Sequence, residues 1–142
     1  MIPELSDCIL DHIAIAVNSI EKTKKVYEDI GLSFNEEREI VKEQGVTTAF
    51  ALIDKNAHIE LLEPFGENGP IHKYLEKKGP GIHHICFRVK DIVKKCQELT
   101  DKDYILLNPS PVKGAGGCLV NFLHPKSTGG VLIEVSQKMG ES

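Results

Sequence analysis

The most informative feature of this sequence is a pair of histidines and a pair of glutamates that recur at matching places in its two halves. His12 and His84 stand in similar alternating runs, 72 residues apart (84 − 12). Glu60 and Glu134 occur in two further apolar segments, 74 residues apart (134 − 60). A duplicated unit can bring equivalent side chains to one centre. Two histidines and two glutamates there would form a nitrogen and oxygen site for one divalent metal ion.

Strand periodicity assigns the first histidine to a face. Successive side chains of a strand point to opposite faces, so His12 shares a face with Ala14 and Ala16. Ile13 and Ile15 point the other way, and we expect them to feed a core beneath the helices. His12 is therefore expected on the concave face.

The two glutamates are unusual for strands. A carboxylate in the middle of an apolar strand is costly unless it is paired or bound to a metal. A single histidine in a strand is usually structural, but coincidence at four equivalent positions favours a metal site. This donor set suits Co, Zn, Ni, Fe or Mn rather than a thiolate cluster. With four protein ligands, a coordination position stays open for a substrate oxygen or water, as in catalytic sites.

Length and composition limit the alternatives. The 142 residues, 41% of them hydrophobic, suffice for one domain with one core. The net charge of −4 argues against nucleic acid or an anionic membrane as a partner. The four cysteines show no CxxC pair, no apolar stretch is long enough to span a bilayer, and no signal segment is evident, so we expect a reduced, cytoplasmic protein in which Cys86 is a buried core residue.

Each half predicts the element order βαβββ. We expect module one over about 9–64, a linker with a short helix over 65–80, and module two over 81–138. In module one, a helix after Asn18-Ser19 should end at Gly31. The predicted strands are 10–17, 32–42, 45–53 and 57–63, then 82–89, 104–107, 117–124 and 130–137 with a helix over 91–101.

Several ordered motifs resemble one known family. They are Leu10-Asp11-His12-Ile13-Ala14, Glu43-Gln44-Gly45-Val46, Ile59-Glu60-Leu61-Leu62-Glu63-Pro64, Gly81-Ile82-His83-His84-Ile85, and Asn121-Phe122-Leu123-His124-Pro125-Lys126 leading to Gly130-Val131-Leu132-Ile133-Glu134. The ordered set, over about residues 9–137, resembles the vicinal oxygen chelate superfamily and within it the methylmalonyl-CoA epimerases. That resemblance implies an α+β fold in which two βαβββ modules pair into a curved mixed sheet around a central metal site.

The resemblance also implies an activity. The chain would be an isomerase that interconverts the 2R and 2S forms of methylmalonyl-CoA by proton transfer at C2, through an enolate stabilised by Co, Zn, Ni or Mn. His12, Glu60, His84 and Glu134 would be the metal ligands, with Glu134 as one base and Glu60 as a candidate for the second. The resemblance further suggests a homodimer with an acyl-CoA substrate.

Three other residues are predicted to contact substrate. Lys126 could meet a CoA phosphate or the substrate carboxylate. Gly116 lies in a glycine-rich stretch where backbone could approach the acyl-CoA. Thr48 stands where some epimerases carry the glutamate used as second base, and a hydroxyl cannot replace a carboxylate unaided. The second acid or base is therefore Glu60, a metal-bound water or another group of the chain, and Thr48 is expected to form part of the wall.

Two alternatives belong to other functional classes. Glyoxalase I uses a similar set of ligands, but bacterial glyoxalases commonly have an arginine four residues after the first histidine, where this chain has Ala16. A metal-free binding or resistance protein of the same fold would tend to lack the ligands that this chain retains. His58, His72 and His124 have no repeat partner of the same type and are interpreted as structural.

Overall fold

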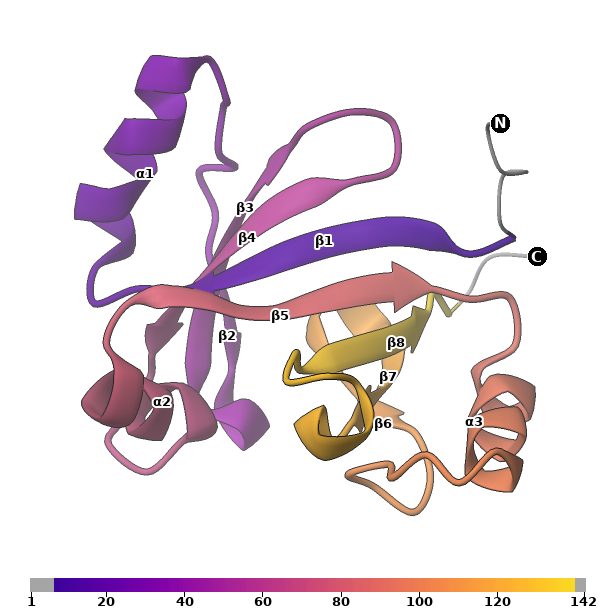
Figure 1. The fold of residues 1–142 in the computed structure, drawn as a ribbon. Coiled ribbons are helices and arrows are strands. Elements are labelled where there is room, and N and C mark those ends of the chain that lie inside the picture. Colours follow the sequence, from indigo (N-terminus) through magenta and orange to yellow (C-terminus); the bar gives the residue numbers. More distant parts are fainter. Residues whose placement is uncertain (1–6, 140–142) are drawn as a thin grey trace. The chain divides into compact units, whose positions relative to one another are not determined.

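The computed structural model describes residues 7–139 and divides the chain into two compact units (Figure 1). The first unit is His12–His84, and the second joins the segment that ends at Asp11 to the segment that begins at Ile85. Each unit has the element order βαβββ, and strands β1 and β5 contribute residues to both. The predicted α+β class with two βαβββ modules is confirmed.

The first unit holds four strands in the order β2-β3-β4-β1. Strand β4 pairs parallel with β1 and antiparallel with β3, so the glutamate strand is central in this sheet. Helix α1 follows β1, and helix α2 follows β4 (Figure 1). The elements are β1 (Ile9–Ala16), α1 (Ile20–Ile30), β2 (Glu39–Val41), a 3-10 turn (Lys42–Gln44), β3 (Val46–Leu52), β4 (His58–Pro64) and α2 (Pro70–Lys78).

The second unit repeats this topology with the strand order β5-β8-β7-β6. Strand β8 pairs parallel with β5 and antiparallel with β7. Its elements are β5 (Gly81–Arg88), α3 (Ile92–Asp101), β6 (Val112–Lys113), β7 (Leu119–Leu123) and β8 (Ile133–Gln137), with 3-10 turns at Ala115–Gly117 and Pro125–Ser127.

The repeat extends to how each helix begins. The Ser19 side chain caps α1, and Asp91, 72 residues later, caps α3. A side chain from the last strand of each unit accepts a hydrogen bond from the first helical N–H: Glu63 in the first unit (3.0 Å) and Gln137 in the second (2.9 Å). Both helices are thereby anchored to their sheets at equivalent points.

Each unit has its own hydrophobic cluster. In the first, Ile13 and Ile15 of β1 pack against a buried cluster that includes Leu61, as the alternation predicts. In the second, the buried cluster contains Val89, Ile92, Cys96, Leu123 and Val135.

Two predicted strands are wrong in extent. In the segment 32–42 only Glu39–Val41 forms a strand, and Phe34 makes an isolated bridge to Ala51. The segment 104–107 is not a strand, since only Leu106 bridges to Leu123, and the edge strand is Val112–Lys113 instead. Both errors fall at the outer edge of a sheet, where few backbone partners hold a chain in extended pairing.

The burial of Leu61 predicts a large loss of stability on truncation. Its side chain is 0% exposed in the core of the first unit. We expect Leu61→Ala to lower the free energy of unfolding by about 3 kcal/mol, because it removes buried methyl groups and leaves a cavity. The melting temperature should fall by about 10 °C. Leu52→Ala is the matched control, since Leu52 is 66% exposed; equal losses in the two variants would contradict this packing.

Within residues 7–139, no helix combines the length and apolar character needed to cross a membrane.

Candidate metal centre and active site

His12 and Glu60 are placed together by the parallel pairing of β1 with β4. The register aligns Ala14 with Glu60 and His12 with His58, so these side chains emerge from neighbouring strands on one face. His12 and Glu60 are each 8% exposed. His12 Nε2 lies 3.7 Å from Glu60 Oε2. The strand alternation inferred from the sequence therefore places both groups correctly.

His84 completes a cluster in the first unit. Its side chain is 6% exposed, and its Nε2 lies 3.2 Å from Nε2 of His12. The two rings meet edge to face with centroids 5.3 Å apart. His12 thus lies close to two of the other three predicted ligands, Glu60 and His84.

The donor atoms of this cluster suit a divalent metal. Ligand atoms about 2.0–2.2 Å from one ion lie about 3–3.6 Å from one another. The 3.2 Å separation of the two histidine nitrogens falls in that range, and the 3.7 Å separation from His12 to Glu60 lies just beyond it. Imidazole nitrogens with a carboxylate are ligands that Zn, Co, Ni or Mn accept. The residues present fit such an ion.

Glu134, the fourth predicted ligand, belongs to the second unit. It lies in β8 and is 6% exposed. Its strand neighbours are Cys86 on β5 and Phe122 on β7. Burying an ionised carboxylate between a thiol and a phenyl ring is costly. Such a group therefore suggests pairing with a positive charge or a function in proton transfer.

Glu60 has matching neighbours in the first unit. It pairs with Ala14 on β1 and with Phe50 on β3. Each glutamate thus stands between a small residue on the parallel side and a phenylalanine on the antiparallel side. Glu60 and Glu134 are therefore equivalent in their strand environment as well as in sequence position.

His83 contacts His84 through the ring nitrogens that face each other. The Nδ1 atoms of the two rings lie 2.8 Å apart, so one ring must donate to the other. When His84 donates from Nδ1, its Nε2 keeps the lone pair that metal binding needs. His83 itself packs edge to face on Tyr74, with centroids 4.9 Å apart.

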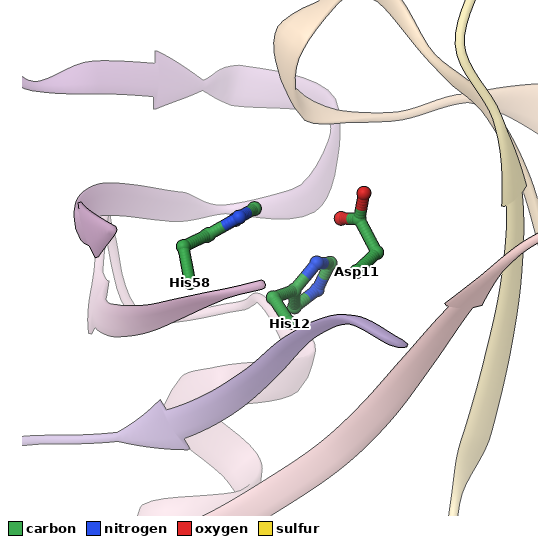
Figure 2. A group of neighbouring side chains, drawn as sticks. All are labelled: Asp11, His12 and His58. Atoms are coloured by element: carbon green, nitrogen blue, oxygen red, sulfur yellow. The ribbon is translucent and has the colours of Figure 1, made fainter. Parts of the chain in front are cut away.

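His58 lies beside these residues, although its lack of a repeat partner predicts a purely structural role. Its Nε2 is 3.4 Å from Oε2 of Glu60, and its ring stacks on that of His12 with centroids 5.0 Å apart. Figure 2 shows these two rings on β1 and β4, with Asp11 drawn alongside. The sequence carried a usable signal, since His58 and Glu60 are two residues apart on one strand and share its face.

The predicted substrate-contacting residues lie in different places. Thr48 is 3% exposed and its hydroxyl donates to the carbonyl of Glu39 at 3.4 Å. In the second unit, Lys126 is exposed on a 3-10 turn. Gly116 is exposed with φ of 68°, a left-handed conformation that favours glycine.

None of the four cysteines, all of which lie within the described residues 7–139, forms a disulfide. Burial raises the pKa of the Cys96 thiol and of the Cys118 thiol. Cys86 is 0% exposed and its thiol donates to the Ser136 hydroxyl at 3.3 Å, in keeping with the predicted core role. Neither Cys96 nor Cys118 is suited to act as a thiolate at neutral pH.

Comparison with known proteins agrees with this architecture. The model of the Glyoxalase/Bleomycin resistance protein/Dioxygenase superfamily matches residues 11–122. The chain belongs to this superfamily.

Its relatives include named epimerases. The mitochondrial methylmalonyl-CoA epimerase of Dictyostelium discoideum is 42% identical over 91% of this chain and 78% of its own length. An ethylmalonyl-CoA/methylmalonyl-CoA epimerase of Cereibacter sphaeroides is 39% identical over 90% of this chain and 96% of its own. The solved structure of a Streptomyces coelicolor methylmalonyl-CoA epimerase variant in complex with 2-nitronate-propionyl-CoA superposes with a TM-score of 0.87 at 33% identity, covering 92% of this chain and 97% of that one. The predicted likeness to the epimerases within this superfamily is confirmed.

Proposed function

We propose that this protein is a metal-dependent epimerase that interconverts the 2R and 2S forms of methylmalonyl-CoA. One observation carries the proposal: in a chain about 40% identical to named epimerases, the buried His12 has its Nε2 3.2 Å from that of His84 and 3.7 Å from a carboxylate oxygen of Glu60. The acyl-CoA ligand of the Streptomyces relative supports the substrate class.

We propose His12, Glu60, His84 and Glu134 as the ligands of one divalent ion, Co, Zn, Ni or Mn. The equivalence of the two glutamates in burial and strand neighbours supports including Glu134. A bound ion would supply positive charge that offsets the negative charge developing on the substrate's thioester oxygen.

The protein's own part is to move a proton. In the proposed reaction the Glu134 carboxylate takes the C2 proton, the C–H electron pair passes into the enolate, and a second group returns a proton to the opposite face. Glu60 or a water molecule is the proposed second group. The phenylalanines beside the two glutamates, Phe50 and Phe122, would limit water around the enolate.

Thr48 is proposed to form only the wall of this site. Its hydroxyl donates to the Glu39 carbonyl, and a threonine hydroxyl cannot replace a carboxylate as an acid or base unaided. We expect Thr48→Val to leave the epimerisation rate within about threefold and to cost about 1 kcal/mol of stability through the lost hydrogen bond. A larger rate loss with unchanged metal content would show that the hydroxyl participates in proton transfer.

The test of function is deuterium incorporation at C2. The purified protein is incubated with one epimer of methylmalonyl-CoA and divalent metal in D2O, and the product is followed by NMR. We expect deuterium at C2 and conversion to the other epimer, both far faster than without protein. A glyoxalase assay with the glutathione hemithioacetal runs in parallel; activity there alone would favour glyoxalase I, and activity in neither would favour a binding protein.

A homodimer in the cytoplasm is also proposed. The family resemblance supports the dimer, and four cysteines that form no disulfide suit a reducing compartment. Light scattering of the purified protein would measure the oligomeric state.

A further inference from the structure

We propose that His58 is a positioning residue that holds Glu60 in the orientation needed to bind metal. This inference rests on the proposed metal site, because it concerns how one of its ligands is held. His58 is outside the four repeated ligands, and nothing in the repeat requires a histidine at its position.

The contact of His58 with Glu60 carries the inference. His58 Nε2 lies 3.4 Å from Glu60 Oε2, at the long end of hydrogen-bonding range. The side chains are 19% and 11% exposed, so water does little to weaken this contact. A carboxylate that binds metal through one oxygen can accept a hydrogen bond at the same time. The residue that donates this hydrogen bond fixes the orientation of the carboxylate.

The ring of His58 is itself held in place. It stacks on His12 with ring centroids 5.0 Å apart and an interplanar angle of 29°. Figure 2 shows the two labelled side chains. On β3, Phe50 approaches it with centroids 5.4 Å apart. A ring confined by two aromatic neighbours loses little further freedom when it donates a hydrogen bond.

In the second half of the chain, a different type of residue stands at the position equivalent to His58. The position that matches His58 is Leu132, two residues before Glu134, and leucine has no hydrogen-bond donor. The duplicated glutamates therefore differ in one respect: only Glu60 has a donor on its own strand at this position. We infer that this donor is what holds Glu60 in place as a ligand.

The test measures metal affinity in His58 variants. His58→Leu copies the residue at the matching position of the other half and removes the donor. We expect its Co²⁺ affinity, measured by competition with a chelator, to fall by about 10–100-fold. His58→Gln keeps an N–H donor and should recover much of that loss. At saturating Co²⁺ the visible absorption spectrum should keep its shape in both variants, because the ligands are unchanged.

His72→Leu is the matched control, since His72 also contacts a carboxylate, Glu76, in the same unit. It should leave Co²⁺ affinity unchanged, and thermal unfolding should show all variants folded. Affinity within twofold of the parent in His58→Leu would overturn the inference. So would a changed Co²⁺ spectrum, which would make His58 a ligand.

The epimerase assay is run separately on the parent protein. A parent that binds Co²⁺ but does not epimerise methylmalonyl-CoA would refute the proposed function and leave the role of His58 standing. A parent that binds no divalent metal would refute both.

Discussion

Replacing His12 or His84 with alanine is expected to remove most of the bound divalent metal. Each change deletes an imidazole nitrogen, and the two nitrogens lie 3.2 Å apart at the centre of the cluster. Residues that only hydrogen-bond to a metal ligand typically contribute about 10–100-fold to metal affinity. Loss of a direct ligand should lower the affinity by more than that. Elemental analysis of the purified variants after dialysis measures the effect.

The control for this prediction is His72→Ala, which removes a histidine from helix α2. It should retain the parent's metal content. If both His12→Ala and His84→Ala kept the metal content of the parent, the metal would bind elsewhere. That result would contradict the assignment of the repeated histidines as metal ligands.

Much of the fold can be predicted from the sequence repeat, because the repeated residues make equivalent contacts in the two units. Ser19 and Asp91 cap equivalent helices, and Glu63 and Gln137 anchor them to equivalent strands. Short polar residues before an apolar stripe are strong local signals of a helix start. The helices and the central strands can therefore be predicted to within a few residues.

The edge strands could not be predicted in the same way. Residues 32–38 and 104–107 carry apolar side chains that cover the core, and Leu32, Phe34 and Leu106 pack on its clusters. Apolar character reports burial, whereas strand pairing depends on backbone partners that are distant in sequence. The same pattern can thus describe a covering loop.

In the candidate site, too, some features can be predicted from the sequence and others cannot. Alternation along the strands puts His12 and Glu60 on their faces, and the register of β1 with β4 confirms the placement. The contact between His58 and Glu60 depends on side-chain torsions, which no periodicity encodes. A search for repeated residues also passes over His58, because its counterpart is Leu132.

Glu134→Gln should reduce epimerisation by about 10²–10⁴-fold, the usual contribution of a positioned acid or base. Glutamine has nearly the same shape as glutamate but cannot take the C2 proton. Glu134 is 6% exposed in β8, so a substitution that preserves its volume should leave the protein folded. The measurement is C2 deuterium exchange at saturating metal, with circular dichroism as the check on folding.

Glu63→Gln is the control. We expect this substitution to be tolerated because a glutamine already stands at the equivalent position of the second unit. Glu63 accepts a hydrogen bond from the Ile20 N–H, and Gln137 does the same for Ile92 in the second unit. Loss of exchange in Glu134→Gln alone, at metal saturation, would separate proton transfer from metal binding and from general effects of lost charge. A normal exchange rate in a folded, metal-loaded Glu134→Gln protein would remove Glu134 from the chemistry and transfer the role of base to Glu60, despite its contact with His58.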